Sequence, residues 1–130
     1  MKQPAAVLGV GQTRHRSKRT DVSIAGLCRE AADRAVASAG LALADIDAVV
    51  VGKAPDLFEG VMMPELYLAD ALGAVGKPLL RVHTAGSVGG ATGIVTANLV
   101  QAGIHRRVLG HATSGPALQQ NLICVMEARP

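Results

Sequence analysis

The feature that most constrains the fold is a repeated alternation of short apolar segments with longer amphipathic ones. The short segments are runs of Val, Leu, Ala or Ile bounded by glycines and turns, and they predict buried strands. The longer segments have helical periodicity and end at glycines. In chain order the expected strands are residues 5–11, 46–51, 78–83 and 106–110. The expected helices are residues 21 or 23 to 38, residues 64–72, and a third that starts in the glycine-rich turn of residues 85–90, at Gly86 or Ser87, and runs to about residue 102. This βαβαβαβ order favours an α/β fold, with helices packed on a mostly parallel sheet.

The pattern decays after Gly110. Residues 111–116 have the composition of a loop, and residues 117–126 fit a short helix or a strand equally well. We therefore divide the chain into a domain of residues 1–110 and a divergent tail of residues 111–130.

Basic residues are concentrated at the start of the chain. The first twenty positions hold five basic residues and no acidic one, whereas the remainder has eight basic and ten acidic residues. Residues 14–19 either contact a phosphate, such as that of coenzyme A, or form a solvated loop. Nucleic-acid binding is not indicated, because Phe58 and Tyr67 are the only aromatic residues and neither lies among the basic ones.

The remaining composition argues for an ordinary cytoplasmic chain. No apolar stretch approaches the length of a membrane span. The two cysteines, Cys28 and Cys124, have neither disulfide-framework nor zinc-site spacing, so no metal is expected. Cys28 falls on the apolar stripe of the first helix and is expected in the core.

The segment that carries chemical information is residues 81–90, Arg-Val-His-Thr-Ala-Gly-Ser-Val-Gly-Gly. It predicts a strand, a sharp turn of small residues and then a helix. Such a turn places a side chain at a helix N-terminus, where backbone N–H groups and the helix dipole favour negative charge, as a catalytic thiolate requires. The alternative is that Gly86, Gly89 and Gly90 only let the helix pack close to the sheet. The residues alone leave both interpretations open.

Several segments, taken together, resemble the opening of a thiolase-superfamily protein of the actinobacterial lipid-transfer type, associated with steroid and cholesterol catabolism. They are residues 7–13 (Val-Leu-Gly-Val-Gly-Gln-Thr), 21–23, 45–52, 64–66, 76–78 and 81–90. The resemblance runs in order from about residue 5 to residue 109. It implies that the chain forms the N-terminal portion of a thiolase-type βαβαβαββ half.

The sequence departs from this family at two places. Ordinary thiolases have a nucleophilic cysteine in a C-x-x-G pattern at the turn, and matching Gly89 to that glycine puts Gly86 at the cysteine position. His83 and Ser87 are weak catalytic candidates, and Thr84, Gly86 and Ser87 are the expected substrate-binding residues. The second departure is the tail, which does not resemble the family's continuation, so the final strand is expected to be missing or replaced. A truncated or frame-shifted product would explain the tail.

The resemblance implies acyltransferase or thiolase-type chemistry on acyl-CoA thioesters in lipid or steroid degradation. Two alternatives stay open: a retro-aldolase subunit acting on a steroid side-chain acyl-CoA, which Gly86 favours, and a truncated, non-catalytic fragment. The expected ligand is a coenzyme A thioester, held as substrate. Full-length relatives imply a homodimer and, for the aldolases, a zinc-ribbon OB-fold partner.

The same reasoning makes three structural predictions. Gly86 should lie at a strand-to-helix junction, with little room for a Cβ or with a φ that glycine tolerates best. The pocket should be lined by Thr84, Gly86, Ser87 and residues 53–59, at the edge of the sheet where open α/β folds bind ligands. The third helix should expose apolar surface when the chain is alone.

Overall fold

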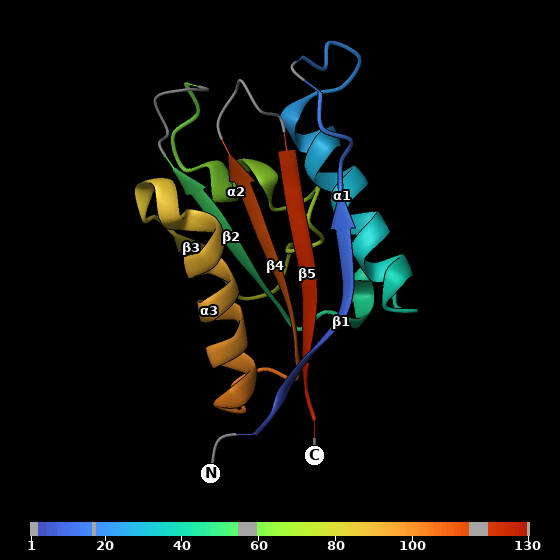
Figure 1. Cartoon of the computed structure of the whole chain (residues 1–130), viewed down its shortest axis with the longest axis vertical. Coiled ribbons are helices and arrows are strands. Elements are labelled where there is room, and N and C mark those ends of the chain that lie inside the picture. Colours follow the sequence, from blue (N-terminus) through green and yellow to red (C-terminus); the bar gives the residue numbers. More distant parts are fainter. Residues whose placement is uncertain (1–2, 17, 55–59, 115–119, 130) are drawn as a thin grey trace.

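The computed structural model describes residues 3–16, 18–54, 60–114 and 120–129. These residues form a single five-stranded sheet with helices on both faces (Figure 1). The strands are β1 (Ala5–Gln12), β2 (Ala48–Ala54), β3 (Leu79–Val82), β4 (Arg107–Ser114) and β5 (Gln120–Ala128). The α-helices are α1 (Ile24–Ser38), α2 (Pro64–Leu68) and α3 (Val88–Gln101), and short 3-10 turns form η1 (Leu43–Asp45) and η3 (Ala85–Ser87).

The strand order in the sheet is β1-β5-β4-β2-β3. Strand β2 is parallel to both β3 and β4, and β5 is antiparallel to both β1 and β4. Four strands therefore run in one direction and β5 alone runs against them. The α/β fold with a mostly parallel sheet is confirmed.

The end of the chain differs from the prediction. Residues 111–114, expected as a loop, continue β4, and the final strand that was expected to be missing is present as β5. Strand β5 inserts between β1 and β4 and pairs with both. The prediction failed because His111 and Thr113 are buried polar residues, so β4 lacks a continuous apolar pattern. The division of the chain into a domain of residues 1–110 and a tail of residues 111–130 that departs from the family's sequence stays a prediction.

Helix α1 is specified by its own residues. The Ser23 hydroxyl caps it by accepting a hydrogen bond from the Gly26 amide at 3.1 Å. Its buried stripe faces β1 and β5, and its exposed face carries ion pairs between Arg29 and Asp33 and between Arg34 and Glu30. The buried residues are Leu27, Cys28, Ala31, Ala32, Ala35 and Val36. Cys28 is thus confirmed as a core residue.

Glycines in the sheet let the helices lie close to it. A Cβ on Gly9 or Gly11 would collide with the backbone of α1. On the opposite face, a Cβ on Gly52 or Gly110 would collide with the side chains of Thr92 and Thr96 on α3. The glycines therefore set how closely each helix approaches the sheet.

The core is split by the sheet into two clusters. The larger cluster lies between the sheet and helices α1 and α2, and it includes Val49, Val51, Leu109 and Ile123. The smaller cluster lies under α3. Helix α2 is shorter than predicted: its α-helical part ends at Leu68, and turns lead from there to Gly73.

Candidate functional site

The β3–α3 turn lies at the carboxyl edge of the parallel strands. Strand β3 pairs with β2 in register, Val51 with Arg81 and Gly52 with Val82, so the two strands end at the same edge. In Figure 1 the start of α3 is at the top of the molecule, beside the end of β2. Ligands of open α/β sheets bind at this edge, which makes the turn the candidate site.

The turn itself is η3, followed directly by α3. The Ser87 amide and the Ser87 hydroxyl both donate hydrogen bonds to the Thr84 carbonyl, at 3.2 and 2.9 Å. Residues 83–87 are all exposed. Ser87 is the N-cap of α3 but makes no side-chain cap hydrogen bond, and the first turn of α3 holds no acidic residue. The positive end of the α3 dipole therefore lies at the exposed edge of the sheet. No acidic side chain in the first turn of α3 neutralises it.

Gly86 lies at the strand-to-helix junction, as expected, but the reason given for it is wrong. A Cβ on Gly86 would meet no atom within 4 Å, and its φ is not in the positive range. The strained residue is its neighbour Ala85, with a φ of 47°. A non-glycine residue in this region marks a backbone that the surrounding structure holds in place. The sharp turn between strand and helix is thus present, and its residues Ala85 and Gly86 carry no nucleophilic atom.

His83, Thr84 and Ser87 do not form a catalytic arrangement in the described part of the chain. The Ser87 hydroxyl donates to a backbone carbonyl rather than to a base. Across the described residues, no hydrogen bond joins His83 to either hydroxyl. Their roles as catalytic or substrate-binding residues stay predictions. The other expected lining, residues 55–59, falls outside the described residues, and Lys53 is buried at 2% exposure.

A polar layer near this edge was missed by the sequence analysis. His111 is fully buried on β4, in register with Val51, and Lys53 is in register with Thr113. Arg81 on β3 lies in the same row as His111 and makes an ion pair of 3.5 Å with Glu65 at the start of α2. These side chains lie on the α1 and α2 face of the sheet, opposite α3. The sequence did carry a signal for this layer. Polar residues follow the apolar runs of β2 and β4 at alternate positions, as Lys53 on β2 and as His111 and Thr113 on β4.

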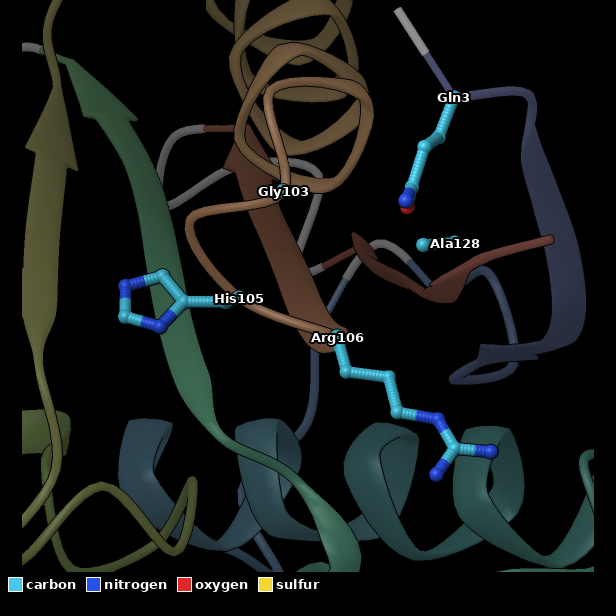
Figure 2. Close-up of a pocket in the computed structure, with 5 residues that line it drawn as sticks. All are labelled: Gln3, Gly103, His105, Arg106 and Ala128. Carbon is cyan, nitrogen blue, oxygen red and sulfur yellow. The ribbon is translucent and has the colours of Figure 1, made fainter. Parts of the chain in front are cut away.

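Residues 83–87 line neither of two cavities in the described part of the structure. The larger, of about 380 Å³, is at the opposite end of the sheet. Figure 2 shows that two of its polar side chains, His105 and Arg106, point away from each other. Binding sites for small molecules need polar groups that converge, so this cavity is not a candidate active site. Its lining is Gln3, Gly103, His105, Arg106 and Ala128.

The smaller cavity, of about 130 Å³, is a groove between α3 and the open part of the sheet. Its lining is mostly apolar or glycine: Val10, Gly89, Thr92, Gly93, Gly110, Ala112 and Cys124. Burial raises the pKa of the Cys124 thiol, so this sulfur is a poor nucleophile. Within the described ranges no cluster of His, Cys, Asp and Glu side chains could hold a metal ion, and no helix is long and apolar enough to cross a membrane.

No family model and no curated protein matches the chain. Solved structures do match. The priming β-ketosynthase of the R1128 polyketide pathway aligns over 98% of this chain and 51% of its own, with a TM-score of 0.82 and 20% identity. The Acat5 thiolase from Ascaris suum, solved with coenzyme A, aligns over 85% of this chain and 30% of its own, with a TM-score of 0.72 and 18% identity.

A third structure, an Ltp2–ChsH2(DUF35) aldolase, has 29% identity and a TM-score of 0.66 over 85% of this chain and 28% of its own. The chain spans about half the length of the synthases that it matches. Its fold is that of one thiolase-type half.

Proposed function

We propose that the chain is a thiolase-like protein of lipid degradation that binds an acyl-CoA thioester at the β3–α3 turn. The observation that carries the proposal is an exposed helix N-terminus at the carboxyl edge of the sheet, in a thiolase-type half. Backbone N–H groups at that position favour an oxygen that carries negative charge. A thioester oxygen acquires such charge when the carbon beside it becomes an enolate.

The residues of the turn argue against a covalent acyl-enzyme. Ala85 and Gly86 have no nucleophilic atom, and the Ser87 hydroxyl is hydrogen-bonded to the Thr84 carbonyl. Thiolase-type acyl transfer requires an activated nucleophile beside a base. We therefore favour a reaction in which the acyl-CoA is held without a bond to the protein.

Retro-aldol cleavage is such a reaction, and the 29% identity to an aldolase structure supports it. A base takes the proton of a β-hydroxyl group, and the bond between the α and β carbons breaks. Its electrons form the thioester enolate, which the start of α3 stabilises, and a proton then returns to the α carbon. The products are a carbonyl compound and a shortened acyl-CoA. The steroid side chain suggested by the sequence is the proposed source of the acyl group.

The base is proposed to lie outside this chain's turn, as the family resemblance implies. A zinc-ribbon OB-fold partner is proposed to complete the site, since the similar aldolase structure includes a DUF35 component. The exposed basic residues Arg14, Arg16 and Lys18 follow β1 at the same edge of the sheet and are proposed to contact the phosphates of coenzyme A. A cytoplasmic location goes with this proposal.

Calorimetric titration of the chain with coenzyme A and with a β-hydroxyacyl-CoA tests the binding step. A Ser87→Asp change puts a carboxylate at the N-terminus of α3, where the thioester oxygen would be. Aspartate is also a good N-cap, so the helix should be kept. We expect an affinity loss of about tenfold or more, equivalent to ~1.4 kcal/mol. The matched control is Asn98→Asp, which adds the same charge at an exposed site further along α3. Equal affinities for the two variants would contradict the site.

Intact-mass measurement after addition of a 3-ketoacyl-CoA tests the reaction class. No covalent adduct is expected, either for the native chain or for a Gly86→Cys variant, because that change supplies a thiol without an adjacent base. Gly86→Cys should fold normally, since a Cβ there meets no atom within 4 Å. An acyl adduct on the native chain would exclude the retro-aldol proposal in favour of acyl transfer.

A further inference from the structure

The β3–α3 turn contains a strained residue, Ala85, with a φ of 47°. A non-glycine residue keeps such a conformation only where the surrounding structure holds it. The hydrogen bonds described within the turn run from the Ser87 amide and hydroxyl to the Thr84 carbonyl, and from the Val88 amide to the carbonyl of Ala85. These bonds shape the turn but do not attach it to the sheet. The attachment must come from the strand before the turn or the helix after it.

Strand β3 is a short attachment. It has four residues, lies at the edge of the described sheet and pairs there with β2 alone. The last pair of this ladder joins Gly52 to Val82. Strand β2 continues for two more residues, Lys53 and Ala54, but these pair with β4. The turn therefore leaves the sheet at the point where backbone pairing between β2 and β3 stops. A side-chain contact across this point would fix the direction in which the turn leaves.

Arg81 makes such a contact. Its Nη2 donates a hydrogen bond to the Lys53 carbonyl at 3.4 Å, one residue beyond the last backbone pair of the two strands. Its Nη1 lies 3.5 Å from Oε2 of Glu65, in the first turn of α2. The side chain thus joins β3 to the end of β2 and to the start of α2. A planar guanidinium can hold two partners at once in this way, whereas the compact ammonium of a lysine cannot.

The contact between Arg81 and Glu65 is largely shielded from water. Each side chain is 19% exposed. The Oε2 atom of Glu65 is buried and accepts no hydrogen bond from the described residues. A buried carboxylate is costly unless an opposite charge lies beside it, and among the described residues Arg81 supplies that charge. The pair is therefore unlike the exposed ion pairs of α1, whose partners separate at little cost.

We propose that Arg81 is a positioning residue for the β3–α3 turn. By holding the Lys53 carbonyl and the Glu65 carboxylate, its guanidinium sets where the strained turn and the N-terminus of α3 lie relative to the sheet. Arg81 acts through the backbone of β3 and does not touch the ligand. The inference rests on the function proposed above for what the turn binds, but the position of the turn can be measured without that ligand.

A thiol introduced at position 86 reports on the turn. Gly86→Cys has open space for its side chain, and the start of a helix lowers the pKa of a thiol below its usual value of about 8.5. The chain also carries Cys124→Ala, so that the fully buried Cys28 is the one native cysteine left. The rate of reaction with a chromogenic aromatic disulfide, followed over a series of pH values, gives the midpoint of thiol ionisation. We expect this midpoint to lie below the usual value.

Two substitutions of Arg81 separate position from charge. Arg81→Met and Arg81→Lys should both move the midpoint to higher pH by about half a pH unit or more, because the thiolate is no longer held at the start of α3. Arg81→Lys keeps the positive charge but cannot hold both partners. Arg106→Met is the matched control and should leave the midpoint unchanged. It removes a guanidinium that lies 3.3 Å from Glu127 at the opposite end of the sheet.

A third variant guards against unfolding. Arg81→Met alone leaves the buried Glu65 carboxylate without its cation, which lowers stability. Arg81→Met combined with Glu65→Gln removes both charges, so circular dichroism should show a folded chain. Its midpoint should match that of Arg81→Met, because neither variant holds the turn.

The outcomes separate this inference from the proposed function. An unchanged midpoint in the double variant would leave Arg81 a structural role only, and a midpoint restored by Arg81→Lys would leave it an electrostatic one. Either result would overturn the proposal. A midpoint at or above the usual value in the Gly86→Cys chain itself would contradict both ideas, because the turn would then lack the positive helix end that Arg81 is proposed to position. Midpoints that shift as expected, in a chain that binds no acyl-CoA, would keep the positioning role and reject the ligand.

Discussion

Helices α1 and α3 cover opposite faces of the same sheet, yet they are built by different rules. Helix α1 has a serine cap, surface ion pairs and a buried stripe, and the glycines facing it are needed for its packing. Helix α3 has no side-chain cap, no charged residue and glycines with open space around them. The sequence of α1 is explained by the fold of this chain alone. That fold explains the sequence of α3 only where its buried threonines lie against the glycines of the sheet.

The largest expected effect is on the α1 side. Gly11→Ala places a Cβ against the Ala31 carbonyl and at 2.5 Å from the Ala35 amide nitrogen. Because this contact is with backbone, α1 must shift as a whole, and the free energy of unfolding should fall by about 1–3 kcal/mol or more. Urea denaturation measures the loss. A Gly11→Ala variant as stable as the native chain would show that α1 is less tightly seated than the structure indicates.

A smaller effect is expected at the two helix starts. Ser23→Ala removes the hydrogen bond to the Gly26 amide and should lower the unfolding free energy by about 1 kcal/mol. Ser87→Ala, the equivalent change on α3, should alter it by only a few tenths of a kcal/mol, because Ser87 makes no side-chain cap bond. Thermal or urea unfolding of the pair gives the comparison directly. Equal losses would mean that α3 is capped like α1.

The elements that the sequence predicted well are those with a local cause. The start of α1 follows from Ser23, and the β3–α3 junction follows from a strand that runs into a turn of small residues. The end of β4 was missed because His111 and Thr113 are polar and buried, and their burial arises from the packing of β4 between β2 and β5, which a local sequence pattern does not show. The buried Lys53 and the strain at Ala85 were also missed, since both arise from tertiary packing.

Gly86 also shows the limit of prediction from sequence. Its position was predicted correctly, but the steric reason was not, because a sequence does not show which glycines face empty space. That distinction separates Gly9, Gly11, Gly52 and Gly110 from the glycines of α3, and it depends on which helix packs over each glycine in three dimensions.

The comparison also predicts a change that stabilises the chain. Gly90→Ala on α3 fills open space and adds a better helix former, so the unfolding free energy of the isolated chain should rise by about 0.5–1 kcal/mol. Urea denaturation measures the gain. A loss of stability would show that the fold of the single chain requires a glycine at position 90.

The smallest expected effect is electrostatic and belongs to the α1 side alone. Arg19 makes an ion pair with Asp21 at 2.8 Å, just before α1, and this hydrogen-bonded guanidinium lowers the pKa of Asp21 to about 2. The unfolded carboxyl has a pKa of about 3.9. A carboxyl whose pKa is lower in the folded chain contributes stability that is complete above its unfolded pKa and is lost as the pH falls through its folded pKa.

The contribution of Asp21 should therefore disappear between about pH 4 and pH 2. Its side chain is 64% exposed, so the effect is small and should weaken further in salt. Urea midpoints measured at several pH values should decline less steeply over this window for Asp21→Asn than for the native chain.

Asn98→Asp is the informative companion variant, because it puts a carboxyl on an α3 that has no charged residue of its own. That carboxyl has no cation on its own helix to lower its pKa, so the variant should follow the native pH profile. If Asp21→Asn and the native chain lose stability in parallel below pH 4, the ion pair contributes nothing, and the contrast between the two helices rests on packing and capping alone.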